Sequence, residues 1–435
     1  MRVALYTLGC KVNQYETQKL AEDFQSKGFD MVDFSDQAEV YVINTCTVTQ
    51  TADSKSRQAV RTAIHRNPRA AVVVTGCYAE TSPEKIRSIE GVDLVIGNEG
   101  KENLAELVLE STAVGRGKIQ NSKSAIRPST GSGQAIRNGR TRALLKVQDG
   151  CDQFCSYCTV PFARPVMSCR PCEEVLSEAK QLAERGFKEI VLTGIRLGVY
   201  DDGEIYLTSL IGKLVDIQGI ERIRLSSIEL TDIPEDLIAL MAENRKLCRH
   251  IHVPLQSGDD EVLARMNRPY TAAEYISFVE NVRSLIPEVA VTTDVMVGFP
   301  GETSGQFENT CNLMEYIRFA RTHVFRYSPR PRTAAAEMPE DVSAAEKERR
   351  STLLMDMAER CSHDFASSLV GKTLPIIVEG KQVRTGVWSG LTDNYVRVEF
   401  EGASHVGEII DVRIESVTQG TACGRLVLEE CGCGR

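Results

Sequence analysis

The feature that most constrains the fold is an alternation of short β-rich runs with helix-length segments. The first hundred residues contain four such runs, "RVALYTL", "VYVINT", "AVVVTG" and "VDLVIG". A helical pattern follows each run, and the predicted helices are Tyr15–Lys27, Ala52–Arg66, Pro83–Glu90 and Glu102–Leu109. This alternation predicts an α/β domain with a parallel sheet whose faces are covered.

Three cysteines come directly after three of these predicted strands. They are Cys10 in "TLGCK", Cys46 in "INTCT" and Cys77 in "VTGCY". The carboxyl ends of parallel strands form the ligand-binding edge of an open α/β sheet, so three thiols distant in sequence are expected to converge there. The competing interpretation is three separate buried cysteines.

The alternation resumes after residue 140. Six further runs are separated by helix-length segments: "TRALLKVQDG", "EIVLTG", "RIRLSSIE", "HIHVPLQ", "VAVTTDVMVG" and "THVFRYS". Six βα units within about 190 residues predict an incomplete, TIM-like (β/α)6 barrel. The chemistry of such barrels lies just beyond the carboxyl ends of the strands, where Cys151, Gly194, Glu229 and Gln256 occur.

The stretch "GCDQFCSYC" spaces three cysteines, Cys151, Cys155 and Cys158, on one short loop. Three thiolates can hold three irons of a 4Fe-4S cluster and leave the fourth iron open for a substrate or cofactor. A structural zinc site needs four protein ligands, and Cys169 or Cys172 could supply the fourth, so this alternative stays open.

Composition places the chain among cytoplasmic proteins. No segment of the 435 residues approaches the roughly 18 apolar residues of a membrane span. In the reducing cytoplasm, 14 cysteines indicate metal ligands, catalytic groups or buried fillers before disulfides. The net charge of −9 argues against a uniformly basic nucleic-acid binder.

Two local runs are nevertheless basic and free of acids. The first is a predicted interdomain linker rich in Gly, Ser and Asn, with Arg116, Lys118, Lys123, Arg127, Arg137, Arg140 and Arg142. The second holds Arg318, Arg321, Arg326, Arg330 and Arg332, interleaved with aromatic residues. Such runs favour contact with RNA or another polyanion.

Motifs along nearly the whole chain resemble the radical S-adenosylmethionine (SAM) methylthiotransferase family. "TLGCKVN", "INTCTV" and "TGC" resemble its N-terminal domain, "GCDQFCSYCTVPFAR" its radical loop, and "HVPLQSG", "VGFPGET" and "YSPR" its barrel. The segments "VGKTLPIIVEG", "LTDNYVRVEF" and "GEIIDVRI" resemble its TRAM module, a small β-barrel. The predicted domains are 1–110, a basic linker 111–140, a radical SAM domain 141–367 and a TRAM domain 368–432.

The resemblance implies two 4Fe-4S clusters, on Cys151, Cys155 and Cys158 and on Cys10, Cys46 and Cys77. The first cluster would bind SAM and yield a 5′-deoxyadenosyl radical that abstracts hydrogen from C2 of an adenine. The second would carry the sulfur, which a second SAM methylates before transfer. All six cysteines are therefore predicted to be catalytic.

Within the family, "TLGCKVNQYE", "CDQFCSYC" and "LTGIRLGVY" look most like the subfamily that acts on N6-threonylcarbamoyladenosine at tRNA position 37. Two alternative substrates remain, N6-isopentenyladenosine 37 and a ribosomal-protein aspartate. A metal-bearing RNA-binding protein without catalysis is the non-enzyme alternative. The expected partners are the tRNA anticodon stem-loop and a small redox protein as electron donor, with no membrane.

The resemblance also suggests cofactor-binding residues. Those predicted are Glu189, Thr193, Gly194, Glu229, Gln256, Ser257 and Gly298. The TRAM segment is acidic, so RNA contact is expected from the two basic runs plus Lys381, Trp388 and Arg397. One departure from the family pattern concerns Arg332, where family members commonly have Gly.

Overall fold

The computed structural model describes residues 1–113, 140–339, 341–382, 384–418 and 420–427. Their contacts divide them into two compact units. The N-terminal unit comprises the described residues of Met1–Gln134, Asp149–Ser168 and Ser328–Glu337. The barrel unit comprises those of Ala135–Gln148, Cys169–Tyr327 and Met338–Arg435. The loop with Cys151, Cys155 and Cys158 therefore belongs to the same unit as the first hundred residues, although it follows them by about fifty residues in the sequence.

The N-terminal unit is built on a five-stranded parallel sheet in the order β2-β1-β3-β4-β5. Its strands are β1 (Arg2–Thr7), β2 (Asp30–Val32), β3 (Val40–Thr45), β4 (Ala71–Gly76) and β5 (Leu94–Val95). Its helices are α1 (Lys11–Ser26), α2 (Gln50–Arg66), α3 (Cys77–Thr81), α4 (Pro83–Arg87), η1 (Lys101–Asn103), α5 (Leu104–Ala113), α6 (Val160–Ala163) and η5 (Ala334–Glu337).

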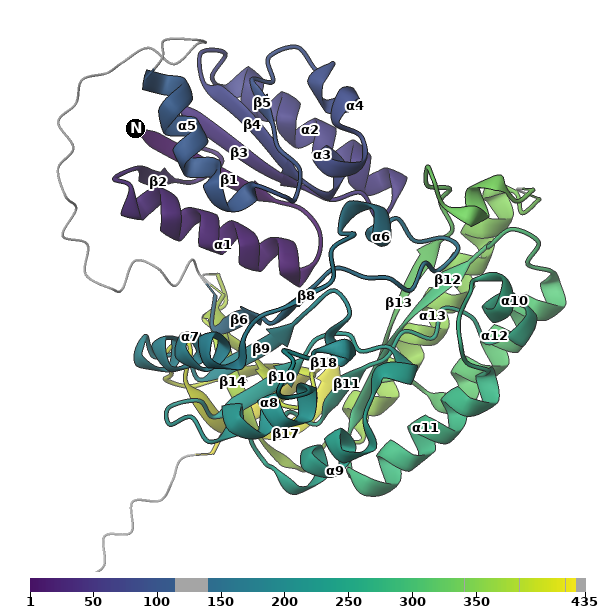
Figure 1. Cartoon of the computed structure of the whole chain (residues 1–435). Coiled ribbons are helices and arrows are strands. Elements are labelled where there is room, and N and C mark those ends of the chain that lie inside the picture. Colours follow the sequence, from purple (N-terminus) through teal and green to yellow (C-terminus); the bar gives the residue numbers. More distant parts are fainter. Residues whose placement is uncertain (114–139, 340, 383, 419, 428–435) are drawn as a thin grey trace, which may run out of the picture. The chain divides into compact units, whose positions relative to one another are not determined.

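Apolar side chains cover both faces of this sheet. Figure 1 shows α1 and α5 on one face and α2, α3 and α4 on the other. All six residues of β3 and of β4 are buried, as expected for central strands of a parallel sheet. The predicted α/β domain is confirmed. The edge strand β2 and the five-residue helix α3 were not predicted, because elements this short carry no hydrophobic period.

The barrel unit contains six parallel strands. They are β6 (Arg142–Lys146), β9 (Glu189–Thr193), β10 (Arg222–Leu225), β11 (His250–His252), β12 (Ala290–Val297) and β13 (Arg321–Arg326). They pair as β10-β9-β6 and β11-β12-β13, and backbone hydrogen bonds of Ile223 and Ile228 join β10 to the β11 region. Among the described residues no pairing joins β6 to β13, so the barrel is incomplete, as predicted.

Helices cover the outside of these strands. They are α7 (Cys172–Glu184), η3 (Leu197–Val199), α8 (Leu207–Val215), η4 (Leu230–Asp232), α9 (Glu235–Glu243), α10 (Asp260–Arg265), α11 (Ala272–Leu285) and α12 (Ser304–Ile317). Their apolar faces share one core with the strands. Two short strands, β7 (Gln148–Asp149) and β8 (Ser168–Cys169), lie where the chain passes from one unit to the other.

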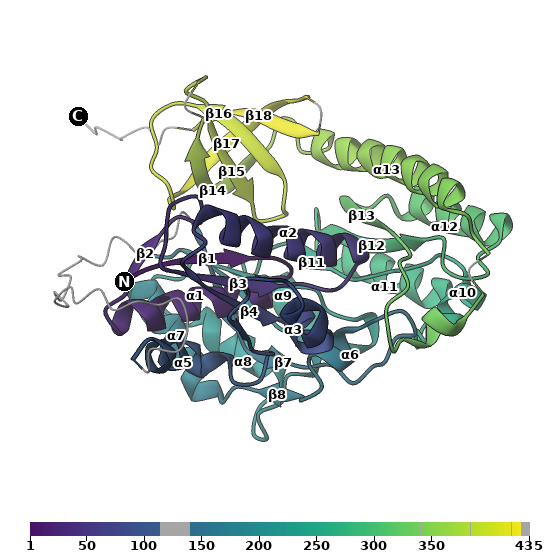
Figure 2. The same cartoon turned by 90° about the horizontal axis from the view of Figure 1, so that it is seen from above.

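A long helix, α13 (Ala344–Ser367), leads into the C-terminal module. Ser343 caps it by accepting a hydrogen bond from the Glu346 backbone, whereas the Glu346 carboxylate pairs with Arg349 and Arg350. Five strands then close into a small barrel in the order β14-β15-β16-β18-β17 (Figure 2). They are β14 (Thr373–Lys381), β15 (Trp388–Thr392), β16 (Arg397–Glu401), β17 (Ile409–Thr418) and β18 (Thr421–Leu426). The described helices include none that is both long and apolar enough for a membrane span.

Candidate functional site

Three thiols lie at one edge of the N-terminal sheet. Cys10 caps α1 just after β1, Cys46 follows β3, and Cys77 opens α3 directly after β4. Strands β1, β3 and β4 are neighbours in the sheet, so its order brings the three cysteines together. Electrostatic coupling of Cys10 and of Cys46 to Cys77 agrees with one group of thiols.

Two glycines make this grouping possible. Gly9 has φ +101°, and a Cβ there would lie 2.9 Å from the Cys46 Cβ and 3.0 Å from its Sγ. Gly76 has φ +94°, and its Cβ would lie 2.4 Å from Oδ1 of Asn44 and 2.5 Å from the Thr45 carbonyl oxygen. A side chain at either position would displace the neighbouring thiol loop, and only glycine tolerates both backbone angles without strain.

Desolvation and hydrogen bonding act in opposite directions on these thiols. Burial raises the pKa of Cys46 to about 12, and burial together with the Cys77 thiol raises the pKa of Cys10. Backbone N–H groups of Asn13 and Val48 donate to Cys10 and Cys46 and oppose these rises in pKa. The Nδ2 of Asn98 lies 3.7 Å from the Cys77 sulfur. Such donors stabilise the thiolate form, which is the form that binds metal.

A buried ion network adjoins the thiols. Arg164 is 4% exposed, and its guanidinium donates to both carboxylate oxygens of Glu16, to Asp149 and to Oδ1 of Asn13, each at 2.8 Å. Lys101, 5% exposed, donates to Glu16 at 2.6 Å. Burial alone would lower the pKa of Arg164, but Glu16, the Cys77 thiol and Asp149 raise it above its ordinary value. Sequence reasoning missed this network, because Arg164 and Glu16 are 148 residues apart.

The loop with Cys151, Cys155 and Cys158 is held in the same unit. The Cys151 backbone N–H donates to the Arg164 carbonyl at 3.3 Å, and the Val160 N–H donates to the Cys158 sulfur at 3.4 Å. Helix α6, which begins two residues after Cys158, packs against α3. At Gly150, φ is +81° and a Cβ would lie 2.1 Å from the Val166 carbonyl oxygen, so the loop requires glycine at its start.

The segment Ser328–Glu337 braces both thiol groups. Arg330 donates at 2.7 Å to Thr47, next to Cys46, and to Asp53. The Ala335 N–H donates to the Ser156 carbonyl within the three-cysteine loop at 2.7 Å. Arg332 has φ +71°, and its guanidinium lies 4.5 Å from the centre of the Phe162 ring. This left-handed backbone explains why glycine is common at this position, and the ring contact offsets part of the strain.

These donor sets fit iron–sulfur ligation. Each consists of three cysteines on a short loop or strand edge, and sulfur atoms in both sets accept N–H hydrogen bonds, which tune such clusters. None of the described cysteines forms a disulfide. Over the described parts of the chain, no three His, Cys, Asp or Glu side chains converge closely enough for one metal ion. In a 4Fe-4S cluster each thiolate binds a different iron.

Cys169 and Cys172 are placed differently, in the barrel unit. Both pack against its apolar core, and the Asp201 N–H donates to the Cys169 sulfur at 3.4 Å. Burial raises the pKa of both thiols, and Asp202 raises it further. Their surroundings favour a packing role over a reactive redox pair. Cys431 and Cys433 lie outside the described residues.

Four of the predicted cofactor residues lie at the carboxyl ends of barrel strands. Thr193 ends β9 and Gly194 follows it, Glu229 comes after β10, and Gln256 follows β11. A Cβ at Gly194 would lie 3.0 Å from Oε1 of Gln148, so the backbone here is closely approached. Arg268, which is buried, forms an ion pair with Glu229 and fixes its carboxylate. These four residues define the barrel rim.

Glu189 does not belong to the rim, and its assignment to a cofactor pocket is wrong. It opens β9 at the amino-terminal end of the strands and is fully buried. Arg224 donates to its carboxylate at 2.7 Å, and Arg222 lies 3.5 Å from it. Both arginines also donate to backbone carbonyls of the small C-terminal barrel: Pro375, Leu391, Thr392 and Asp393. Glu189 therefore helps to dock this module.

Ser257 and Gly298 have structural partners as well. Ser257 is fully buried, and its hydroxyl lies 3.4 Å from that of Thr310. Gly298 has φ +70°, and a Cβ there would lie 2.3 Å from Cγ of Lys347 on α13. Gly298 also donates its N–H to the Glu302 carboxylate at 2.7 Å. Both residues shape the turns beyond the rim strands.

A histidine–aspartate group in the barrel was not predicted. Asp294 on β12 lies 3.4 Å from Nε2 of His252 on β11 and 3.2 Å from Nδ1 of His323 on β13. Burial would raise the pKa of Asp294, but the two histidines hold it below its ordinary value. The sequence alone does not show this group, because Asp294 lies in a different strand from both His252 and His323.

The second basic run does not offer a row of unpaired arginines to RNA. Arg330 is buried with Asp53, so the prediction is wrong for this residue. Arg318 pairs with Asp364, and Arg326 pairs with Glu348. In the C-terminal barrel, Arg397 pairs with Glu379, and Lys381 lies over the Trp388 ring at 5.3 Å. Of the first run, Arg142 pairs with Glu379, and the residues before Arg140 lie outside the described part of the chain.

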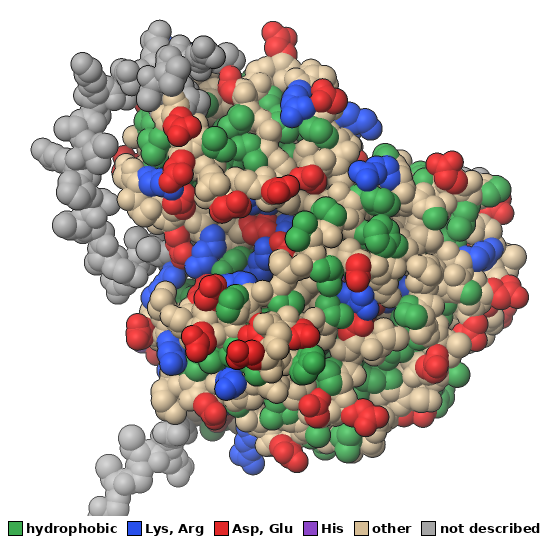
Figure 3. Space-filling model, viewed as in Figure 1, with side chains coloured by type: hydrophobic (Ala, Val, Ile, Leu, Met, Phe, Trp, Pro, Cys, Tyr) green, Lys and Arg blue, Asp and Glu red, His purple; other side chains and the backbone are tan. Residues whose placement is uncertain are grey.

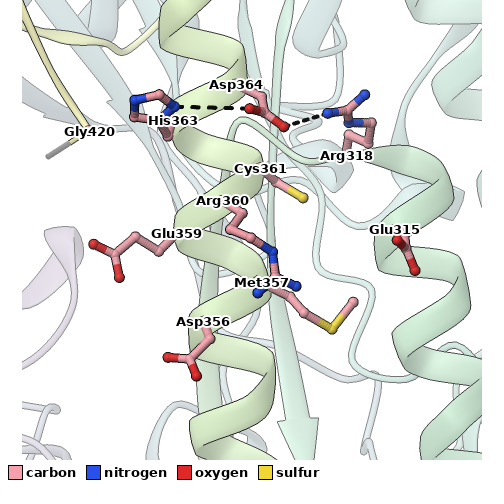
Figure 4. Close-up of a pocket in the computed structure, with 10 residues that line it drawn as sticks. All are labelled: Glu315, Arg318, Asp356, Met357, Glu359, Arg360, Cys361, His363, Asp364 and Gly420. Atoms are coloured by element: carbon pink, nitrogen blue, oxygen red, sulfur yellow. Dashed lines mark hydrogen bonds and ion pairs between the residues drawn. The ribbon is translucent and has the colours of Figure 1, made fainter. Parts of the chain in front are cut away.

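A hollow of about 770 Å³ lies between α12 and α13 (Figure 4). It includes Arg318, which precedes β13, so it is at the amino-terminal end of that strand and away from the rim. In its lining, Asp364 pairs with Arg318 and lies 3.9 Å from Nδ1 of His363. Cys361 also lines it. Because Cys361 is the one cysteine among its described lining residues, the hollow offers no three-cysteine ligand set like those of the N-terminal unit.

Comparison with protein families gives three matches. Residues 2–97 match an uncharacterized protein family, UPF0004; residues 145–314 match the radical SAM superfamily; and residues 367–427 match the TRAM domain. The radical SAM superfamily implies a 4Fe-4S cluster and SAM.

Curated relatives cover nearly the whole chain. A threonylcarbamoyladenosine tRNA methylthiotransferase MtaB of Bacillus subtilis is 39% identical, over 95% of this chain and 93% of the relative. The protein of the same name from Aquifex aeolicus is 36% identical over 95% of this chain and 100% of its own length. A tRNA-2-methylthio-N(6)-dimethylallyladenosine synthase of Endomicrobium trichonymphae is 33% identical over 98% and 100%.

Solved structures share the fold. The radical SAM methyltransferase TsrM of Kitasatospora setae matches with a TM-score of 0.57 at 18% identity, over 77% of each chain. The cobalamin-dependent SAM radical enzyme OxsB matches with a TM-score of 0.51 at 12% identity, over 82% of this chain and 56% of the other. At these identities the likeness concerns the fold alone.

Proposed function

Because the chain belongs to the radical SAM methylthiotransferase family, we propose that it transfers a methylthio group to C2 of N6-threonylcarbamoyladenosine at position 37 of tRNA. The observation that carries this substrate is the 39% identity, over 95% of the chain, to a relative named for threonylcarbamoyladenosine. A relative named for dimethylallyladenosine is 33% identical, so the isopentenyl nucleoside is the alternative. A tRNA substrate would place the activity in the cytoplasm.

Two sets of thiols would hold the inorganic groups. Cys151, Cys155 and Cys158 would hold the cluster that binds SAM, and Cys10, Cys46 and Cys77 would hold a second cluster. When bound, these groups and SAM supply the radical that opens an unreactive aromatic C–H bond and the sulfur that replaces the hydrogen. No side-chain acid or base could activate C2 of adenine.

Other residues of the chain would hydrogen-bond the cysteine sulfurs and place a positive charge near them. N–H donors from Val160 and Asn98 reach the Cys158 and Cys77 sulfurs. Thiolate ligands make such a site anionic, and the buried cation Arg164 lies among carboxylates beside it. Hydrogen bonds and nearby charge are the means by which a protein tunes a cluster.

The barrel rim is proposed to contact SAM. Gly194 allows close backbone approach, and Thr193 and Gln256 present polar groups at strand ends. Glu229 is fixed by Arg268 and can accept hydrogen bonds without rearranging. The anticodon stem-loop and a small reducing protein are the partners this chemistry requires.

Nucleoside mass spectrometry tests the proposal. tRNA from cells lacking the protein should contain N6-threonylcarbamoyladenosine without its methylthio group, and the wild-type gene should restore it. A gene with Cys151, Cys155 and Cys158 changed to Ala should not restore it. Loss of the methylthio group from the isopentenyl nucleoside instead would overturn the substrate. An unchanged nucleoside pattern would overturn a role in tRNA methylthiolation.

A further inference from the structure

The N-terminal unit carries a basic hollow on the side of its sheet covered by α2 and α4. Its volume is about 740 Å³, which is within the range of ligand-sized cavities. The charged and aromatic residues that line it are Arg57, Arg61, His65, Lys85, Glu90 and Tyr78. The residues Arg57, Arg61 and His65 recur at four-residue intervals along α2 and thus share one helix face.

The basic side chains of this hollow have no carboxylate partners within the described part of the chain. Among the described residues, no carboxylate forms an ion pair with Arg57, Arg61, His65 or Lys85. The hollow's lining includes a single acid, Glu90. This contrasts with Arg318, which is paired with a carboxylate. In a chain of net charge −9, such a group of cations is a local exception.

Arg57 is held in a fixed orientation. It donates to the Tyr78 hydroxyl at 2.8 Å and to the Ser54 hydroxyl at 3.1 Å, and its guanidinium lies 5.9 Å from the Tyr78 ring centre. A guanidinium has five N–H donors, so further donors remain for a ligand. Pre-orientation reduces the entropy lost when the planar fork binds an oxyanion, and phosphate suits its geometry.

The hollow lies next in sequence to one of the three cysteines at the edge of the N-terminal sheet. Tyr78 lines it and is the residue directly after Cys77. One residue of its wall therefore belongs to α3, the short helix that begins with Cys77, one of the proposed cluster ligands. A ligand in this hollow would therefore be bound by the same unit that carries Cys10, Cys46 and Cys77.

We propose that this hollow binds the phosphate backbone of the tRNA substrate. The inference rests on the proposed function for the identity of the polyanion. Acidic character in the C-terminal barrel and the carboxylate partners of Arg318, Arg326 and Arg330 weaken the case for the other basic surfaces predicted from the sequence. Electrostatic contact with phosphates contributes affinity without reading sequence.

Charge reversal tests the proposal. The variant R61E/K85E changes two exposed residues that have no ion-pair partner among the residues the structure describes. The control K55E/R69E makes the same change in net charge at exposed residues on and just beyond α2 that do not line the hollow. Both full-length proteins should keep the wild-type melting temperature and iron content.

Binding of tRNA is then measured by fluorescence anisotropy at several salt concentrations. Loss of two phosphate contacts should weaken binding on the order of 10-fold or more near 0.1 M salt. The negative slope of log K against log salt concentration should become shallower by roughly 1.5. KM for tRNA should rise while kcat stays near wild type. The control should keep most of the affinity and the wild-type slope.

Several outcomes would overturn the inference. They are unchanged tRNA binding in R61E/K85E, an equal loss in the control, or loss of an acidic protein partner with tRNA binding intact. If the wild-type protein itself neither binds nor modifies tRNA, the proposed function fails. If the wild type does both and R61E/K85E behaves identically, only the assignment of the hollow fails.

Discussion

Replacing Arg164 with Met should loosen the contact between α1 and the three-cysteine loop. The guanidinium makes 2.8 Å hydrogen bonds to Glu16, Asp149 and Asn13, and its side chain is 2% exposed. Removing one partner of a buried ion pair typically costs about 3–5 kcal/mol, because the remaining charge stays buried. Glu16 keeps Lys101 at 2.6 Å, and Asp149 is 22% exposed, so both carboxylates retain some stabilisation.

We therefore expect the lower end of that range, about 3 kcal/mol, for R164M. The variant R164K should lose about half as much, because one ammonium cannot reproduce the bidentate contact with Glu16. The effect should be local, so native-state hydrogen exchange of α1 and of residues 151–164, with anaerobically prepared protein, is the suitable measurement. The free energy of opening of α1 should fall by the stated amounts.

The control is R170M. Arg170 also pairs with a carboxylate, that of Glu178 at 2.7 Å, but it belongs to the barrel unit and should leave exchange in α1 unchanged. A double-mutant cycle of R164M with E16Q should give a coupling energy of about 1.5 kcal/mol or more. Two results would refute the reasoning. One is equal hydrogen exchange of α1 in R164M and R170M, and the other is additive losses of stability for R164M and E16Q in the double-mutant cycle.

Three further variants test other parts of the structure. R332A keeps the left-handed backbone strain and loses the contact with Phe162, so R332G should be more stable than R332A by about 1 kcal/mol in thermal unfolding. R224M should unseat the C-terminal barrel at a cost of about 3 kcal/mol or more, visible as faster proteolysis after α13; unchanged proteolysis would contradict its docking role. Replacing Cys169 and Cys172 with Ser should preserve iron content and tRNA methylthiolation, whereas loss of iron would show that these thiols do more than pack.

Local patterns in the sequence were sufficient for the main elements of the fold. Strands β3 and β4 were predictable because buried parallel strands read as continuous apolar runs. The convergence of Cys10, Cys46 and Cys77 followed from the rule that strand ends share one edge. The edge strand β2 and helix α3 were not predicted, because segments of three and five residues are too short to show a hydrophobic periodicity.

Ion pairs between distant parts of the chain could not be predicted from local patterns. A run without acids predicts unpaired arginines only if no distant carboxylate reaches them. Arg318 pairs with a residue 46 positions away, Arg326 with one 22 away, and Arg330 with one 277 away. Glu189 was misplaced for a related reason. The sequence shows that Glu189 begins β9 and is far from the carboxyl end of the strand. It does not show that Arg222 and Arg224, in the neighbouring strand, pair with its carboxylate.

The same reasoning bears on how an acidic chain can bind a polyanion. A cation already paired with a carboxylate gains little from a phosphate, because it must lose one partner to take the other. Local charge counts in the sequence therefore overestimate the phosphate affinity of the second basic run. They underestimate the phosphate affinity of α2, where Arg57 and Arg61 are interspersed with polar residues and one acid. In the described part of the fold, neither arginine forms an ion pair with a carboxylate. If R61E/K85E loses affinity for tRNA while R318E does not, unpaired cations in the fold, and not basic runs in the sequence, determine where RNA binds.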